Sequence, residues 1–338
     1  MSDGSNADGE LARELFNGFI GSHVLYALIT TGVLDQLAER EGAAVVGELA
    51  RRGDCSLRLL SALLKAANRL GIVRYRPQGD TVELTAGGRQ AHRLRGYFTA
   101  SVGGFGDVFR NLDALALGRE KFGESIDQDG RLTAVGCAQN WSFQQAIFDR
   151  ATERIDYRHV LDLGCGAGVR LVHLLRRNPH ARGTGIDRSP EACALARDRA
   201  HVMGVGDRVT IVQADVGEIV TGPDGCPGLL DVDLATSYFV LHHFMQSRAG
   251  GVDFLKSLAV ALPGCDHFVF ADGFAEPEEA RGSPPLFTLA YELFHEFTDV
   301  ALVTHRRQCE LFEQAGYLVE QDLGFGHPLE HLFVLRRS

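Results

Sequence analysis

Residues 160–168 decide the fold of this chain, and they read Val160-Leu161-Asp162-Leu163-Gly164-Cys165-Gly166-Ala167-Gly168. The apolar run Val160–Leu163 predicts a buried strand, and the spacing of apolar residues over Val169–Leu175 predicts a helix. Between them stand three glycines, which allow the backbone to adopt positive φ or to approach a ligand closely. The stretch therefore predicts a strand, a tight glycine turn and a helix.

A second expected strand, Gly183–Asp187, ends in a carboxylate about 25 residues after Asp162. This is near the spacing at which an acidic residue meets a ribose in nucleotide-binding βαβ units. The loop itself is Gly-x-Gly-x-Gly, whereas the pattern of NAD-binding proteins places its third glycine one position later. An ordinary glycine turn inside an α/β core is the structural alternative.

The segment Asp162–Gly168 resembles the first motif of Rossmann-like methyltransferases that use S-adenosylmethionine. The resemblance implies that Asp187 binds the ribose hydroxyls of this cofactor and that Asp215, after the third expected strand, lies beside the adenine. Ser237 and Tyr238 end the fourth expected strand and are further candidates. All these elements occur in the right order, which disfavours the ordinary turn. The expected cofactor-binding residues are Asp162, Gly164, Gly166, Gly168, Asp187, Asp215, Ser237 and Tyr238.

The composition argues against nucleic-acid-binding and membrane-spanning proteins. The 338 residues are enough for two domains with cores of their own, and the formal net charge of -10 argues against a nucleic-acid partner. No apolar run is long enough to span a membrane. The seven cysteines include no Cys-x-x-Cys pair, which favours free thiols in a reducing cytoplasm. Residues 1–10 are polar, resemble no signal or transit peptide, and predict a disordered tail.

Residues 11–95 predict a winged helix, with three amphipathic helices followed by a hairpin of two strands at 71–76 and 81–85. Winged helices often bind DNA, but the third helix, 57–70, is mostly apolar and leaves few side chains to read a groove. The segment is similar to the N-terminal dimerisation domain of small-molecule O-methyltransferases. That resemblance implies a homodimer.

Residues 96–153 predict a helical linker rich in aromatic side chains, which would either wall a substrate pocket or pack between domains. Three arginines in it, Arg110, Arg119 and Arg131, are candidates to bind a carboxylate, and the sequence does not select among them. Residues 154–338 predict a Rossmann-like methyltransferase domain with a doubly wound, mostly parallel sheet. Its later strands are expected at 208–215, 231–238, 267–272, 316–320 and 331–335.

The segment Val240–Phe244 follows the fourth expected strand and contains His242 and His243. It resembles the site of small-molecule O-methyltransferases, in which the first histidine is a general base that removes a proton from a hydroxyl group. An imidazole suits that role because its pKa lies near working pH. A solvated or helix-capping histidine is the structural alternative for His242.

The segment Phe287–Glu296 resembles the matching part of iron-dependent phenylpyruvate C-methyltransferases and related 2-oxo acid C-methyltransferases. The resemblance implies a metal held by His242 and His295. That family places an acidic residue where this chain has His243, and a third imidazole would favour zinc, copper or nickel over iron. His243 otherwise points away, and His295 is otherwise a core or interface histidine. Glu292 is either a partner of His295 or a surface residue.

These features predict a cytoplasmic, homodimeric, S-adenosylmethionine-dependent methyltransferase that acts on a small molecule in secondary metabolism, such as antibiotic biosynthesis. The finer hypothesis is C3-methylation of an arylpyruvate or of 5-guanidino-2-oxopentanoate, assisted by Fe or Zn. The same-class alternative is metal-independent O-methylation of a phenolic or polyketide hydroxyl. A winged-helix regulator that senses S-adenosylmethionine, and a methyltransferase fold with non-methylating chemistry, are alternatives of other classes. His305, His327 and His331 have no partner at metal spacing in the sequence.

Overall fold

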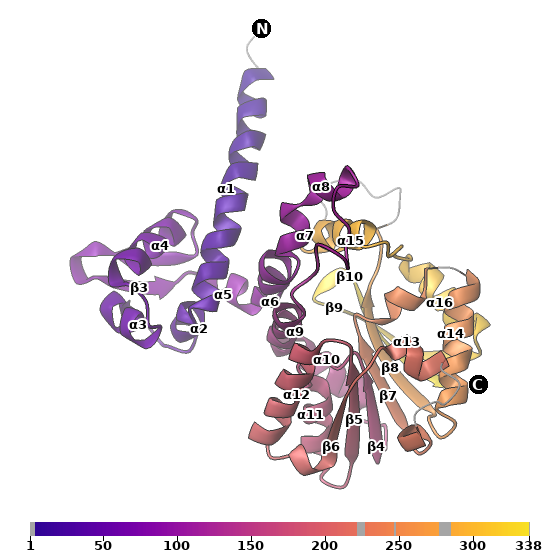
Figure 1. Cartoon of the computed structure of the whole chain (residues 1–338). Coiled ribbons are helices and arrows are strands. Elements are labelled where there is room, and N and C mark those ends of the chain that lie inside the picture. The colour runs from indigo at the N-terminus through magenta and orange to yellow at the C-terminus, as the bar shows by residue number, and fades with distance from the viewer. Residues whose placement is uncertain (1–3, 222–226, 247, 277–284, 338) are drawn as a thin grey trace. The chain divides into compact units, whose positions relative to one another are not determined.

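The structure is a computed structural model in which residues 4–221, 227–246, 248–276 and 285–337 are described. The chain divides into two compact units, Met1–Gly104 and Phe105–Ser338. The division falls inside the segment 96–153 that the sequence predicts to be a linker. Figure 1 labels the elements of both units, and each unit is described by itself below.

The first unit is a winged helix. Its three-stranded antiparallel sheet has the order β1-β3-β2, and its core is closed by fully buried leucines such as Leu28, Leu34, Leu49 and Leu64. The elements are α1 (Gly4–Thr30), α2 (Val33–Ala38), β1 (Ala44–Val45), α3 (Val46–Arg52), α4 (Leu57–Arg69), β2 (Val73–Arg76), the 3-10 turn η1 (Pro77–Gly79), β3 (Thr81–Leu84), α5 (Ala86–Arg93), α6 (Arg95–Phe98) and the π-helical turn η2 (Thr99–Gly104).

The N-terminal segment differs from its sequence prediction. The sequence predicts a disordered tail over residues 1–10, but α1 begins at Gly4, and only residues 1–3 of this segment lie outside the described chain. No proline interrupts the segment, and Glu10, Leu11 and Ala12 are strong helix formers. Because adding a residue to an existing helix is easier than starting one, the packed part of α1 propagates toward the N-terminus.

The second unit is built on a seven-stranded sheet with the order β6-β5-β4-β7-β8-β10-β9. The first five strands in this order are parallel, and β10 runs antiparallel to both neighbours. This confirms the predicted doubly wound, mostly parallel sheet. The strands are β4 (His159–Leu163), β5 (Arg182–Asp187), β6 (Val209–Gln213), β7 (Leu234–Tyr238), β8 (His267–Gly273), β9 (Tyr317–Phe325) and β10 (His327–Arg337).

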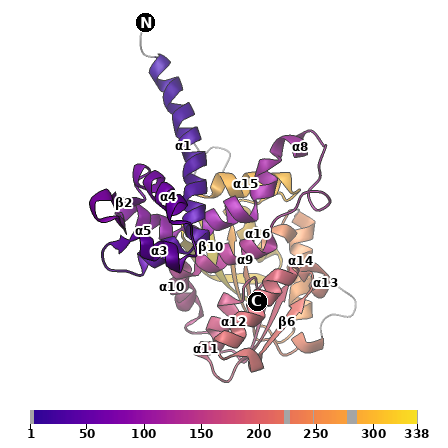
Figure 2. The same ribbon diagram turned by 60° about the vertical axis from the view of Figure 1, so that its left-hand side comes forward.

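Helices cover both faces of this sheet, as Figures 1 and 2 show. One face packs against α10, α11 and α12, and the other against α13, α14 and α16. Every residue of β4 is buried, as expected for a parallel strand covered on both sides. The helices are α7 (Gly106–Arg110), α8 (Leu112–Ala116), α9 (Gly130–Gln139), α10 (Trp141–Thr152), α11 (Val169–Arg177), α12 (Pro190–Val202), α13 (Val216–Thr221), α14 (Arg248–Ala261), α15 (Thr288–Phe297) and α16 (His305–Gln314), with 3-10 turns η3 (Gly206–Arg208), η4 (Pro227–Leu229) and η5 (Leu241–Phe244).

This topology places the functional segments at one edge. In an open α/β sheet, ligands bind outside the carboxyl ends of the strands, where the strand order reverses. Here the reversal lies between β4 and β7, so the glycine turn after β4 and the turn η5 after β7 lie side by side. Within the described residues, none of the helices has the length together with the hydropathy that crossing a bilayer requires.

Candidate active site

The glycine turn has the backbone that the sequence predicts. Gly164, Gly166 and Gly168 have φ values of 69°, 53° and 68°, a region that residues with a side chain rarely adopt. Packing also leaves no room for a side chain at two of the glycines. A Cβ on Gly164 would overlap Val240, and a Cβ on Gly168 would lie 3.1 Å from that of Ala196. The turn therefore needs glycine both for its conformation and for its close contacts.

Two of the expected acidic residues lie beside this turn. The carboxylate of Asp187 accepts hydrogen bonds from the backbone N–H groups of Gly166 (2.8 Å) and Ser189 (2.9 Å), which fixes the turn against the end of β5. Asp162 is buried, and one of its oxygens accepts a 2.7 Å bond from the hydroxyl of Thr236. Burial raises the pKa of Asp162 to about 6 and also raises the pKa of Asp187.

The other expected cofactor residues have different surroundings. Asp215 accepts a 2.7 Å bond from the N–H of Gly217 just beyond β6. The hydroxyl of Ser237 donates to the carbonyl of Leu163 at 3.1 Å, so it links β7 to the neighbouring strand β4. Tyr238 is buried, and a guanidinium group, that of Arg170, lies 3.5 Å from its ring centroid.

A second group of residues lies beyond the end of β7, where η5 carries His242. The Nδ1 atom of His242 is 2.7 Å from Oδ1 of Asp272, and its backbone N–H donates to Oδ2 of the same residue at 2.9 Å. Asp272 lies near the end of the neighbouring strand β8, and Tyr291 of α15 donates its hydroxyl to Oδ1 at 3.1 Å. His242, Asp272 and Tyr291 are all buried, so their mutual orientation is fixed.

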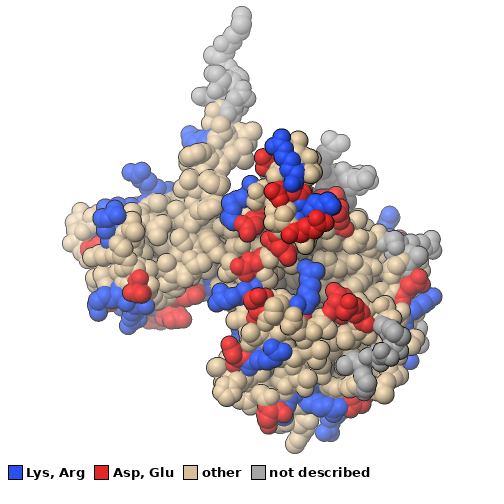
Figure 3. Space-filling model, viewed as in Figure 1, with Lys and Arg blue, Asp and Glu red and all other residues tan. Residues whose placement is uncertain are grey.

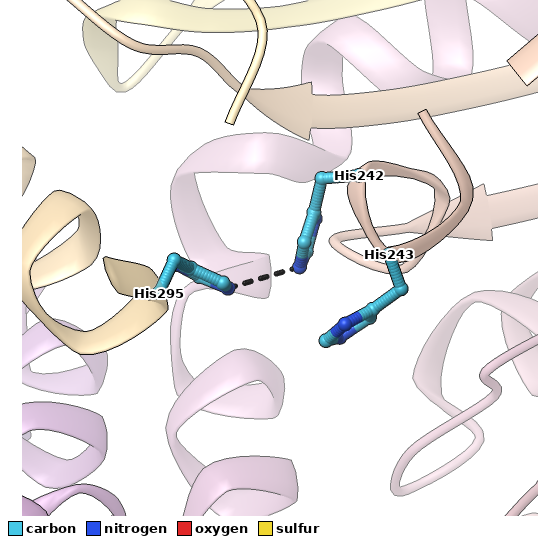
Figure 4. A group of neighbouring side chains, drawn as sticks. All are labelled: His242, His243 and His295. Carbon is cyan, nitrogen blue, oxygen red and sulfur yellow. Dashed lines mark hydrogen bonds between the residues drawn. The ribbon is translucent and has the colours of Figure 1, made fainter. Parts of the chain in front are cut away.

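His295, in the last turn of α15, completes this group. Its Nδ1 atom lies 2.7 Å from the carbonyl oxygen of Tyr291, and its Nε2 atom lies 3.0 Å from Nε2 of His242 (Figure 4). A carboxylate and a peptide carbonyl only accept hydrogen bonds, so we assign the ring protons of both histidines to Nδ1. Both Nε2 atoms then carry lone pairs that face each other, an arrangement that requires a proton or another cation between them.

His243 joins the pair. One ligand atom from each of His242, His243 and His295 lies within 4.8 Å of the others, and Figure 4 shows the ring of His243 beside the other two. Burial, followed by the charge of His242, lowers the pKa of His243 to about 3, and the same two causes lower the pKa of His295 to about 3. Both rings therefore remain neutral at physiological pH, which is the state that binds a metal.

Two members of this group are not predicted from the sequence as site residues. Asp272 is expected there only as the end of a strand, although an acidic residue at the carboxyl end of the strand beside β7 is a signal that could have identified it. Tyr291 is expected only as part of a helix. Glu292, in contrast, is not the partner of His295: its carboxylate accepts a 2.6 Å bond from the N–H of Glu276, and Nδ1 of His295 is bound to its own helix.

Aromatic side chains line up beside the histidines within the second unit. The ring of Phe294 stacks on that of Phe105 with centroids 3.9 Å apart, and Phe122 meets Phe294 edge-on at 6.0 Å. Phe294 also lies 5.2 Å from His295. Among the arginines expected to bind a carboxylate, Arg110 pairs with Asp107, and Arg119 and Arg131 are exposed.

Two family comparisons agree with this geometry. Residues 160–259 match the family described as a methyltransferase domain, and residues 13–90 match the O-methyltransferase dimerisation domain. The first match begins in β4 and covers the glycine turn, both ribose and adenine candidates, and the turn with His242. The chain is an S-adenosylmethionine-dependent methyltransferase. The matched dimerisation domain supports a homodimer of this methyltransferase.

Related proteins cover almost the whole chain of this methyltransferase. The chain is 24% identical over 90% of its length to the methyltransferase ungE' of Aspergillus campestris, of which it covers 90%. It is 24% identical over 95% of its length to the indolepyruvate C-methyltransferase of Streptomyces griseus, of which it covers 93%. It is 26% identical over 90% of its length to the 2-ketoarginine methyltransferase of Streptomyces arginensis, of which it covers 87%.

Solved structures show the same fold. The human N-acetylserotonin methyltransferase, solved in complex with S-adenosylmethionine, aligns over 100% of both chains with a TM-score of 0.68 and 18% sequence identity. At this identity the likeness concerns the fold alone. Because the alignment spans the whole of both chains, both units of this chain have counterparts in that single chain.

Proposed function

We propose that this methyltransferase transfers a methyl group from S-adenosylmethionine to C3 of a small 2-oxo acid, with a divalent metal held by His242 and His295. The observation that carries the proposal is the pair of Nε2 atoms facing each other at 3.0 Å, with both ring protons used elsewhere. Two nitrogen atoms that are each about 2.1 Å from one metal ion lie about 3 Å apart when they are neighbouring ligands. The residues present therefore fit such an ion.

The surroundings of the pair also suit a metal. A histidine that binds a metal usually donates its other N–H to a carboxylate or a backbone carbonyl, which fixes the tautomer. Asp272 supplies the carboxylate for His242, and the carbonyl of Tyr291 does the same for His295. We propose His243 as a further ligand, and three imidazoles favour Zn over the Fe that suits two histidines and a carboxylate.

The chemistry follows from the substrate class. A 2-oxo acid offers carboxylate and ketone oxygens, and a bound divalent cation would act as a Lewis acid that stabilises its enolate form. The protein itself contributes position: the histidines and Asp272 hold their geometry without further movement, and buried aromatic walls keep water away. The relatives named for indolepyruvate and 2-ketoarginine act on compounds of this class.

The aromatic wall suggests which 2-oxo acid is bound. Phe105, Phe122 and Phe294 lie together beside His295, and aromatic rings favour offset stacking or edge contacts with other rings. We therefore propose an arylpyruvate as the preferred substrate over a guanidino 2-oxo acid.

The cofactor is proposed to lie over the glycine turn. Each oxygen of Asp187 keeps a second lone pair after its backbone bond, which leaves it able to accept the ribose hydroxyls. Asp215 is proposed to lie beside the adenine. Several buried side-chain atoms have no hydrogen-bond partner within the described chain, and four of them are proposed to receive the amino-acid end of the cofactor: Asn140 Oδ1, Asp162 Oδ2, Arg170 Nε and Tyr238 OH.

Metal-independent O-methylation is the second candidate. The hydrogen bond between His242 and Asp272 is also the arrangement of a general base held by a carboxylate, and the dimerisation domain is that of O-methyltransferases. In that case Nε2 of His242 would have to face a substrate hydroxyl, but Nε2 of His295 already lies 3.0 Å from it.

A reducing cytoplasm is our proposed location for the protein, and the cysteines within the described residues are free thiols.

A substrate panel separates the two candidates. Purified enzyme, before and after removal of metal by a chelator, is offered phenylpyruvate, 5-guanidino-2-oxopentanoate and simple phenols, and release of S-adenosylhomocysteine is measured. We expect turnover of arylpyruvates that falls at least about tenfold on metal removal and returns with Zn²⁺ or Fe²⁺. The same loss is expected for His295→Ala, and not for His173→Ala, which removes a histidine from another His–Asp pair. Turnover of phenols alone, unaffected by the chelator, would overturn the proposal.

A further inference from the structure

A second histidine cluster lies in the catalytic unit, apart from the group around His242. It consists of His305, at the start of α16, Asp322 of β9 and His331 of β10. Nε2 of His305 is 2.8 Å from one oxygen of Asp322, and Nδ1 of His331 is 2.6 Å from the other. One ligand atom from each residue lies within 4.8 Å of the others.

Other aspartates that bind a histidine in this chain are neutralised by an arginine. Asp35 holds His92 and Arg95, Asp149 holds His173 and Arg177, and Asp231 holds His159 and Arg182. Within the described chain the ion pairs of Asp322 are with its two histidines, and the ion pair of Asp272 is with His242. Asp272 and Asp322 thus each lie in a cluster with two or more histidines. Neither forms an ion pair with an arginine of the described chain.

The cluster has the chemistry of a cation site. Two imidazoles and a carboxylate are typical ligands of Zn²⁺. His305 lies in the first turn of α16, where the helix dipole opposes a protonated ring and so favours the neutral imidazole that binds metal. About a third of the His305 and Asp322 side chains is exposed (34% and 33%), so an ion can enter from solvent.

We propose that His305, Asp322 and His331 bind a second divalent transition metal, most naturally Zn²⁺, with water completing its coordination. The three ligands come from three different elements, so the ion joins α16 to both antiparallel strands. His331 is the ladder partner of Asp272 across β10 and β8. The ion therefore holds β10 in place beside β8, the strand that carries Asp272. This site is independent of the proposed reaction.

The test uses a variant with His242→Ala and His295→Ala, which removes two of the three proposed active-site ligands and leaves only His243 of that group. After chelation and desalting, this variant is titrated with Zn²⁺, and bound zinc per chain and the melting temperature are measured. We expect about one equivalent and a rise in melting temperature on binding. Adding Asp322→Asn or His331→Ala should weaken binding at least about tenfold, because loss of even an outer partner of a metal ligand costs 10- to 100-fold.

His173→Ala in the same background is the matched control, because it removes one histidine from a His–Asp pair of similar exposure that also contains Arg177. It should leave zinc affinity unchanged. Asp322→Asn keeps the shape of the side chain, so it remains informative if His331→Ala fails to fold. No zinc bound by the parent variant, or equal affinity in the parent and Asp322→Asn variants, would overturn the proposal.

Discussion

At the scale of single residues, the candidate active site depends on which ring nitrogens of its histidines carry protons. Asp272 and the carbonyl of Tyr291 take the Nδ1 protons of His242 and His295, so two lone pairs converge at 3.0 Å. At the other end of the site, buried atoms of Asp162 and Arg170 lack partners in the described chain. Unpaired buried polar atoms cost free energy, so each group is expected to bind a complementary charge.

Arg170 provides the residue-scale prediction. Its buried guanidinium stacks on Tyr238 and donates to Gln144 at 3.1 Å, which leaves Nε for a ligand. If Arg170 binds the carboxylate of the cofactor, Arg170→Met should weaken binding of S-adenosylhomocysteine about tenfold or more, since a hydrogen bond to a charged group contributes about 1.5–3 kcal/mol. Binding of 5′-methylthioadenosine, which lacks the amino-acid end, should not change. Titration calorimetry with both ligands measures this difference.

The control for that experiment is Arg176→Met on the exposed side of the same helix, which should bind both ligands normally. An equal loss of affinity for both ligands in Arg170→Met would show general damage to the site instead. Equal affinity of the variant and the native protein for S-adenosylhomocysteine would exclude Arg170 from the cofactor site.

At the scale of elements, the glycine turn between β4 and α11 packs closely against two neighbouring segments. Gly164 contacts Val240, and Gly168 contacts Ala196 of α12. Gly164 has φ 69° and lies against Val240, the residue that leads from β7 into η5. The glycine turn and the segment carrying His242 therefore share a contact with no room for a side chain. Their separation is set by packing, and a change in one is expected to displace the other.

Gly164→Ala tests this contact. The left-handed conformation costs about 1–2 kcal/mol for a residue with a Cβ, and the overlap with Val240 adds about 1–3 kcal/mol. Gly204→Ala is the matched control, because Gly204 has φ 70° and, apart from Gly204 itself and its two chain neighbours, no described residue has an atom within 4 Å of the point that its Cβ would occupy. Gly204→Ala should therefore lower the free energy of unfolding only by the cost of the left-handed conformation, about 1–2 kcal/mol. Urea unfolding compares the two, and equal destabilisation by both substitutions would contradict the packing argument.

At the scale of the whole molecule, the first unit leaves an apolar stripe uncovered on α1. Its side chains are 42–68% exposed, and the visible described part of this helix is mostly uncharged in Figure 3. An exposed apolar stripe of this kind marks a protein–protein interface, and the matched dimerisation domain indicates that the partner is a second copy of the chain. The residues are Leu11, Leu15, Phe16, Phe19 and Ile20.

Charges placed on this stripe should separate the dimer. We expect Phe16→Asp combined with Phe19→Asp to give a monomer, because two buried carboxylates without partners would oppose association. Val260→Asp on α14 is the control, since Val260 is 80% exposed and lies on another helix. Light scattering coupled to gel filtration reports the mass. A dimer that persists in the double variant would exclude α1 from the interface.

Features that depend on neighbours along the chain could be predicted from the sequence. The glycine turn, the strand and helix on either side of it, and the winged helix follow from local spacing and backbone preference, and His242 and His295 were marked by short motifs. Only the tertiary structure brought Asp272, Tyr291 and the cluster of His305, Asp322 and His331 together. Those groups come from strands and helices far apart in sequence, so their distances are set by sheet order and register, which no local pattern encodes.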